Sequence, residues 1–201
     1  MIKNFLLLLT SIFLLNGCIS ITKEVPSYDT YRLSLKNSNN QTNVPLNKSI
    51  YIYEPKSLSS INTKAINYSK EHFEQEKYAL SKWSDKPTKM LQELMANYFV
   101  SKNSFNYVTT SNIKTNTDFR LVSQLVDFRH TFTKTNSYAD FSIRVFLIDN
   151  KTEEVFFKSF TYNKVAKKSD ARGVVIAFDE LINIFLTDLN NFLEKSIIKS
   201  K

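Results

Sequence analysis

The stretch YADFSIRVFLIDNK, residues 138–151, carries the clearest structural signal in the chain. Ser142 and Arg144 fall on one side of it, and the other side carries Phe141, Ile143, Val145 and Leu147. This alternation predicts a strand with one buried face. Asp149-Asn150-Lys151 is typical of a turn, and it leads into a second β-prone segment, residues 154–165. We therefore expect an antiparallel hairpin, which sets the character of the whole fold.

Other segments on either side of this hairpin also have the composition of strands. Residues 118–132 and 105–109 are rich in Phe and Val, and residues 31–35 and 49–53 alternate between apolar and polar side chains. Residues 64–69 and 77–82 flank a charged turn and predict a second hairpin. The Asn-rich segment 36–48 between two of these strands predicts a loop.

Two amphipathic helices complete the pattern. The first is expected after Ser84 or Asp85, either of which can cap it, with Pro87 in its first turn and an apolar stripe that includes Met90, Leu91, Leu94 and Met95. The second spans about 169–199 and has two apolar rows, with acids on the opposite face. That polar face favours packing on the sheet over lying on a membrane. The predicted fold is a single α/β domain, an antiparallel or mixed sheet with a central and a long C-terminal helix packed on it.

The N-terminus indicates export and lipidation. Lys3 is followed by an apolar run from Phe5 to Leu15, which Leu15-Asn16-Gly17-Cys18 closes. Eleven helical residues span only about 16 Å, roughly half of a bilayer core. We therefore expect a lipoprotein signal peptide (1–17), a lipidated tether (18–27) beginning at acylated Cys18, and one domain (28–201). An ordinary secretory signal with an incidental cysteine is the alternative interpretation.

The composition argues against several classes of function. Two glycines, Gly17 and Gly173, are too few for a Walker-type loop or a Rossmann fingerprint. One cysteine and two histidines leave too few ligands for a structural zinc site, so we expect neither cofactor nor metal. Removing residues 1–17 removes Lys3 and lowers the net charge by one, from +8 to +7. The remaining lysines are scattered, which argues against nucleic acid but leaves attraction to anionic lipid head groups open.

Several motifs together resemble a known family. The first motif is an early Tyr31-Arg32-Leu33. The central motif is Tyr78-Ala79-Leu80-Ser81-Lys82-Trp83-Ser84-Asp85-Lys86-Pro87, which runs into Met90-Leu91 and Leu94, and the expected strand 118–132 follows it. Leu15-Asn16-Gly17-Cys18 resembles the bacterial lipobox, the motif that precedes lipid attachment at cysteine. Together with this lipobox, the motifs and their order resemble those of the ABC-type transport auxiliary lipoproteins, the PqiC-like partners of MCE-domain lipid-transport systems. The structural signature carried over from the family is Trp83, Pro87, Leu91 and Leu94. The chain departs from commoner members in its Asn-rich loop and its low glycine content.

This resemblance implies an adaptor rather than an enzyme. It would dock an MCE-domain protein at the outer membrane and assist the passage of phospholipid or another apolar lipid without hydrolysing it. Aromatic surface is expected to carry the docking. Ile19 after the cysteine, where Asp is absent, favours outer-membrane sorting over the inner membrane.

The ionisable residues support a non-catalytic interpretation. Asp127 and Arg129 share a strand face, where a cross-strand ion pair is favoured over catalysis, and Glu153 and Glu154 are not expected to converge. Trp83 is expected to be a packing residue.

Two other classes of protein stay open. One is a free-standing outer-membrane assembly lipoprotein that inserts lipopolysaccharide or β-barrels. The other is a lipid-modified hydrolase, which would need a nucleophile beside His72 or His130.

Overall fold

A computed structural model describes residues 27–36, 46–70, 74–111 and 116–200. In chain order the elements are β1 (Asp29–Tyr31), β2 (Leu46–Ile52), β3 (Ala65–Ser69), β4 (Glu76–Trp83), α2 (Pro87–Ser101), β5 (Phe105–Thr109), β6 (Phe119–Phe132), β7 (Ser137–Asp149), β8 (Val155–Val165) and α3 (Ala171–Lys199). The predicted signal peptide and most of the predicted tether, including Cys18, lie outside the described residues.

The three long strands β6, β7 and β8 form an antiparallel meander. Val122 of β6 is paired with Phe146 of β7, which is paired in turn with Phe157 of β8. The predicted hairpin around Asp149 is thus confirmed. One face of β7 is buried at every second residue because alternate side chains point to opposite faces of a sheet.

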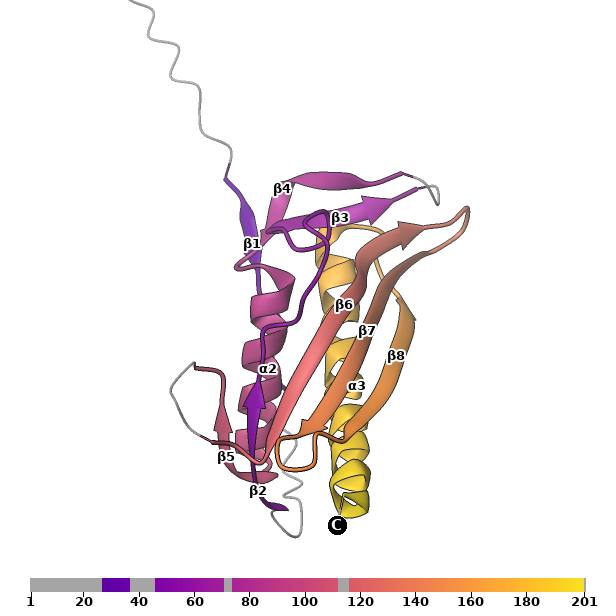
Figure 1. Ribbon diagram of the computed structural model, residues 1–201. Helices are drawn as coiled ribbons and strands as arrows, with labels where there is room; N and C mark the ends of the chain where they lie inside the picture. The colour runs from indigo at the N-terminus through magenta and orange to yellow at the C-terminus, as the bar shows by residue number, and fades with distance from the viewer. Residues whose placement is uncertain (1–26, 37–45, 71–73, 112–115, 201) are drawn as a thin grey trace, which may run out of the picture.

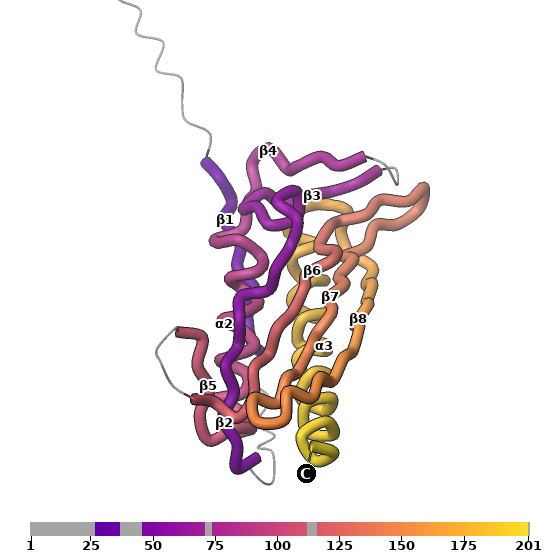
Figure 2. Tube along the Cα trace, in the orientation of Figure 1, coloured from indigo at the N-terminus to yellow at the C-terminus, as the bar shows by residue number. Residues whose placement is uncertain are grey.

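The other edge of β6 is shared between two different strands. β2 pairs with its beginning in parallel (Ile50 with Phe119), and β3 pairs with its end in parallel (Tyr68 with His130). The predicted hairpin of β3 and β4 is confirmed as antiparallel, while β1 extends β4 and β5 extends β2 in parallel. The result is one mixed eight-stranded sheet that curls, as Figures 1 and 2 show.

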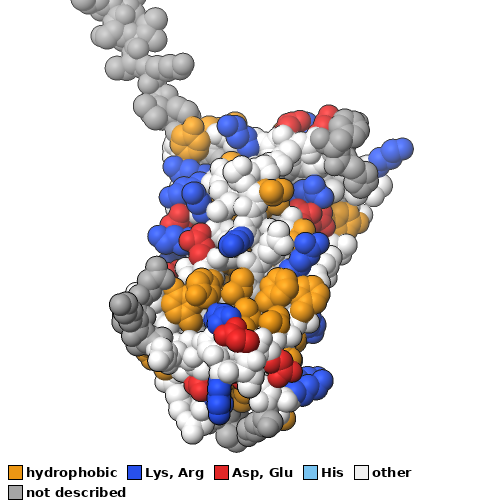
Figure 3. Space-filling model, in the orientation of Figure 1, with side chains coloured by type: hydrophobic (Ala, Val, Ile, Leu, Met, Phe, Trp, Pro, Cys, Tyr) orange, Lys and Arg blue, Asp and Glu red, His pale blue; other side chains and the backbone are white. Residues whose placement is uncertain are grey.

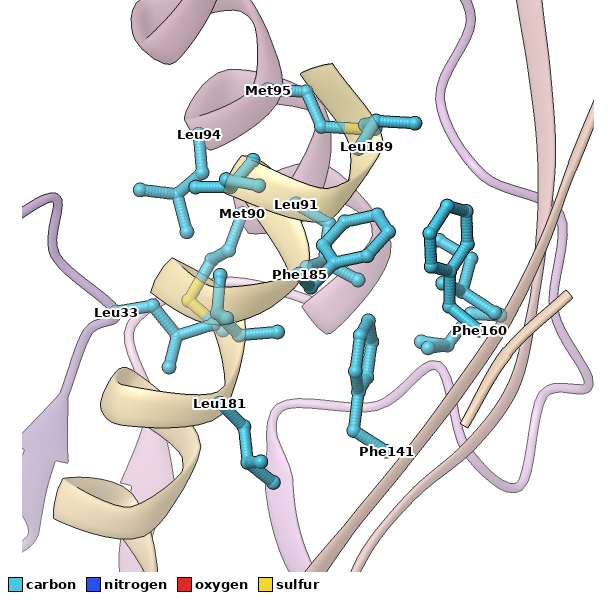
Figure 4. Close-up of a cluster of buried hydrophobic side chains, with 14 of the residues drawn as sticks. Leu33, Met90, Leu91, Leu94, Met95, Phe141, Phe160, Leu181, Phe185 and Leu189 are labelled. Atoms are coloured by element: carbon cyan, nitrogen blue, oxygen red, sulfur yellow. The ribbon is translucent and has the colours of Figure 1, made fainter. Parts of the chain in front are cut away.

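Helix α3 lies behind β6, β7 and β8 and covers one face of them, with α2 beside it (Figure 1). Its inward side chains include Leu181, Phe185 and Leu189, and the ring of Phe185 packs against those of Phe141 and Phe160 of the sheet (Figure 4). The described residues share a single hydrophobic core, so the predicted α/β class and helix packing are confirmed.

The start of α3 explains the one glycine in the folded region. Asp170 caps the helix, its Oδ1 accepting a hydrogen bond of 2.6 Å from the backbone N–H of Gly173. A Cβ atom on Gly173 would lie 2.0 Å from the carbonyl oxygen of Lys168. No side chain fits there without moving the backbone, so this turn requires glycine.

The predicted strand at residues 31–35 is wrong beyond Tyr31. The next residues leave the sheet and bond to α3 instead: Ser34 N–H donates to Asp179 Oδ1 at 2.7 Å, and Lys36 N–H donates to Asn183 Oδ1 at 2.9 Å. Side chains of α3 therefore accept hydrogen bonds from backbone N–H groups that, in a strand, would have bonded to a neighbouring strand. The predicted loop 36–48 is also too long, because β2 already begins at Leu46, although residues 37–45 lie outside the described ranges.

The predicted cap of α2 is wrong as well. Its N-cap is Lys86, which has no side-chain capping bond, while Pro87 occupies the first turn as expected. Asp85 instead accepts the backbone N–H of Lys86 at 2.8 Å and pairs with Lys89 at 3.4 Å. Ser84 is held by the sheet, since its N–H donates to the carbonyl oxygen of Tyr31.

The two ends of the described chain lie at opposite ends of the domain. The first described residues enter beside β1 and β4, whereas α3 runs the length of the molecule and ends at the far side (Figure 1). Among the described helices, none is both long enough and apolar enough to cross a membrane.

Candidate functional site

Trp83 joins the hairpin of β3 and β4 to the main core. Its side chain is 1% exposed, and its ring centroid lies 5.4 Å from that of Phe128 on β6 and 5.9 Å from that of Phe178 on α3. As expected, it is a packing residue. Its ring partners come from a strand and from the C-terminal helix.

The other signature residues also lie in the interior. Pro87, Leu91 and Leu94 are buried along α2, and Figure 4 shows Leu91 and Leu94 in the cluster between α2 and α3. They are therefore unavailable to a partner from solution. Any partner must meet a different part of the molecule.

The ion pair of Asp127 and Arg129 exists, but it is not cross-strand. Arg129 Nη2 lies 3.0 Å from Asp127 Oδ2 within β6, where a bulge between Leu125 and Asp127 shifts the register. Burial raises the pKa of Asp127 from its ordinary value, against the opposing effect of Arg129, and Asp140 on β7 adds to the rise. The group is a structural pair on a bulged strand.

His130 is a core histidine. It is fully buried, its Nδ1 lies 2.7 Å from the hydroxyl oxygen of Tyr78, and its ring contacts that of Phe132. Its Nε2 has no hydrogen-bond partner among the described residues. Burial lowers its pKa to about 4, with a smaller opposing effect from Asp170. His72, the second histidine, lies outside the described residues.

The neighbouring acids Glu153 and Glu154 do not form a carboxylate pair. Glu153 sits in the turn between β7 and β8 with a φ of 59°, and its carboxylate lies 2.6 Å from Arg120 Nη2. Glu154 accepts a backbone bond from Asp149 in the same turn. Within the described residues, no group of three or more His, Cys, Asp or Glu side chains could hold a metal ion.

The face of the sheet opposite α3 carries an apolar area, here called the outer-face patch. Val122, Phe146 and Phe157 form one row across three strands, and Ile148 and Val155 form part of the next. The rings of Phe146 and Phe157 are 5.0 Å apart, and Phe157 is 55% exposed. At the β2 side, the rows are extended by Tyr51 and Tyr53.

Figure 3 shows this patch as hydrophobic side chains gathered in the middle of the visible face, with charged groups around them. Arg120 interrupts the second row between Tyr51 and Ile148, and it is paired there with Glu153. Toward the β6–β7 turn the same face becomes polar: Ser142 donates to Thr161 across β7 and β8. The apolar area is therefore bounded, as an interface with a polar rim would be.

A second feature, the edge pocket, lies between β8 and the last turns of α3. Its volume is about 420 Å³, and it is lined by Val155, Phe156, Phe157, Lys158, Asn191, Phe192, Lys195, Ser196 and Lys199. Phe157 and Val155 belong to both features, so the pocket continues around the free edge of β8 into the outer-face patch.

Neither feature was predicted from the sequence, which indicated only that aromatic surface would carry docking. The signal for the patch was present in the polar-facing positions of the strands, where Phe146 and Phe157 break the alternation. Assigning them to one area requires the register across β6, β7 and β8.

The fold and these surfaces define a one-domain α/β protein with a curled mixed sheet, of which one face is covered by helices while no described helix covers the other. The fold is similar to that of protein XCC0632 from Xanthomonas campestris, of family DUF330, with a TM-score of 0.77 and 16% identity over 86% of this chain and 99% of that chain. It is also similar to an uncharacterized protein, with a TM-score of 0.67 and 10% identity over 83% of this chain and 99% of that one.

A more distant likeness is to the hypothetical protein CT253 from Chlamydia trachomatis, with a TM-score of 0.53 and 6% identity over 73% of this chain and 98% of that one. At these identities the comparisons establish a shared fold. No family model and no curated protein sequence matches the chain.

Proposed function

We propose that this protein is a lipid-anchored, non-catalytic auxiliary component of an ABC/MCE-type intermembrane lipid-transport system. Two independent lines support the proposal. The motifs around Trp83 and the lipobox resemble those of the PqiC-like family. The fold is similar to that of XCC0632 over 99% of that protein's length, and XCC0632 belongs to DUF330, which is a PqiC-like family.

The observation that carries the docking role is the outer-face patch. Contiguous apolar surface with a polar rim marks interaction sites. Tyr53 and Phe157 are 45% and 55% exposed, so both offer ring surface to a partner. Tyr and Phe are also enriched in protein interfaces. The proposed occupant is the MCE-domain protein.

The anchor in this proposal is acylated Cys18, and the membrane is the outer one. The lipobox supports acylation, and Ile19 after the cysteine supports the outer membrane. An anchored adaptor needs a rigid domain and a contact surface. An enzyme would instead need a positioned acid, base or nucleophile.

A pair of matched double variants tests the docking surface. Tyr53→Ser with Phe157→Ser removes two exposed rings from the patch. Leu58→Ser with Leu80→Ser removes exposed apolar groups elsewhere, since these leucines are 69% and 53% exposed. After mild crosslinking in cells, the unmodified protein and the leucine variant should co-purify with an MCE-domain protein. The patch variant should not, and it should show increased detergent sensitivity.

Two results would contradict the proposal. If the unmodified protein never co-purifies with an MCE-domain protein, the free-standing assembly lipoprotein becomes the better interpretation. If the patch variant co-purifies normally, the docking surface lies elsewhere. A genomic observation is independent of both: neighbouring reading frames should encode an ABC ATPase, a permease and an MCE protein.

A further inference from the structure

The edge pocket combines positive charge with aromatic walls. Phe192, Lys195 and Lys199 lie on one side of α3, because residues three and four apart share a helix face. Lys158 comes from the facing edge strand, and its Nζ lies 4.7 Å from the ring centroid of Phe160 and 5.9 Å from that of Phe192. Three lysines from two elements therefore converge on a space bordered by phenylalanine rings.

The positive charge of the edge pocket is not neutralised by the described residues. None of its nine lining residues is acidic, and none of the three lysines forms an ion pair with a described carboxylate. A second pocket, of about 430 Å³, makes the contrast clear. There Lys164 pairs with Glu180 at 2.8 Å, and Lys36 and Asp188 also line the space, so its charges balance.

The C-terminal end of a helix carries a partial negative charge, which opposes an anion at this place. That charge is about half of one elementary charge, whereas the lysines supply three. The net field therefore favours an anion. A volume of about 420 Å³ falls in the usual size range of small-molecule sites.

We infer that the edge pocket binds a single lipid with an anionic, phosphate-bearing head group. The head group lies among Lys158, Lys195 and Lys199. An acyl chain lies against the phenylalanine side chains that line the pocket, Phe156, Phe157 and Phe192. A free anion would contact only the lysine ammonium groups, and an uncharged lipid would contact only the phenylalanine rings.

This inference deepens the proposed function by naming a cargo class, but its test involves no MCE protein. The assay is isothermal titration of protein beginning at Ser20, which contains every described residue. The probes are dihexanoyl phosphatidylglycerol below its micelle concentration, dihexanoyl phosphatidylcholine and inorganic phosphate. The anionic lipid should bind about tenfold or more tightly than either comparison ligand, as expected where several basic groups each contribute.

Two triple variants locate the site. Lys158→Gln, Lys195→Gln and Lys199→Gln together should weaken phosphatidylglycerol binding by about tenfold or more. Lys77→Gln, Lys134→Gln and Lys168→Gln remove the same charge elsewhere and should leave binding within about twofold of the unmodified protein. Melting temperatures of both variants should lie within a few degrees of that of the unmodified protein. None of these lysines forms an ion pair with described residues, and the cation–π contacts of Lys158 are weak because its side chain is exposed.

Several results would overturn the inference: no binding of the anionic lipid, equal affinity for phosphatidylcholine, equal affinity for inorganic phosphate, or equal loss in both triple variants. The ligand comparison decides the matter on the unmodified protein alone. Failure here with normal MCE co-purification would leave the proposed function intact. Lipid binding without co-purification would contradict only the proposed function.

Discussion

Replacing Trp83 with alanine tests whether the β3–β4 hairpin is held to the core through one ring. The indole is 1% exposed and lies between Phe128 and Phe178, so its removal leaves a cavity where β4, β6 and α3 meet. We expect a large loss of stability together with a retained overall fold.

The magnitude follows from the area of the ring. A buried tryptophan removes about 200 Å² from water, and at about 25 cal/mol per Å² this contributes about 5 kcal/mol. Residual compactness of the unfolded chain lowers the figure to about 3–4.5 kcal/mol. Measured costs of truncating buried aromatic residues fall in the same range, about 3–5 kcal/mol. For a domain of this size the melting temperature should fall by about 10 °C.

Urea unfolding followed by far-ultraviolet circular dichroism measures this loss. Fluorescence does not serve, because Trp83 is the only tryptophan. Phe157→Ala is the matched control, since its ring is 55% exposed, and it should cost less than about 1 kcal/mol. A loss below about 1 kcal/mol for Trp83→Ala would refute the reasoning, as would an equal loss in the control.

Three further predictions concern the anchor, the absence of a metal requirement and the buried histidine. Cys18→Ser should abolish metabolic labelling by a fatty-acid probe, and labelling that survives the substitution would contradict the predicted lipobox. Protein beginning at Ser20 should melt in one cooperative transition that a chelator leaves unchanged, and a large downward shift would reveal a metal site. The pKa of His130 is lowered by burial from 6.5 to about 4, so the unfolded chain binds its proton at higher pH than the folded one. The free energy of unfolding should therefore fall as the pH decreases from about 6.5 to about 4. In His130→Gln the same measurement should show a smaller change over this pH range. Equal slopes in the two proteins would contradict the prediction.

Local patterns allowed much of the fold to be predicted. The alternation of apolar and polar side chains from Phe141 to Val145 identified β7, because one face of that strand is buried along its whole length. The apolar stripes of both helices were equally visible, since each helix buries one side. These elements are encoded by neighbours in sequence.

The order in which the strands pair in the sheet could not be predicted from such local patterns. Parallel pairing of β2 and β3 with the two halves of β6 joins segments that are distant in the chain, and no local pattern records it. Residues after Tyr31 have strand-like alternation but bond to Asp179 and Asn183 on α3. The edge pocket could not be predicted either, because Lys158 and Lys195 become neighbours only when α3 packs along β8.

The long helix also acts as a spacer between the two ends of the domain. Phe178 lies beside Trp83 near the end where the described chain enters, whereas Lys195 lies in the edge pocket. Seventeen residues separate them, which is about 25 Å of helix. If Cys18 tethers the entry end to a membrane, the pocket lies at the other end of the domain from the anchor. An extended tether of about ten residues spans roughly 33–36 Å, more than this separation, so the anchor alone leaves the pocket able to face either the anchoring bilayer or the opposite side.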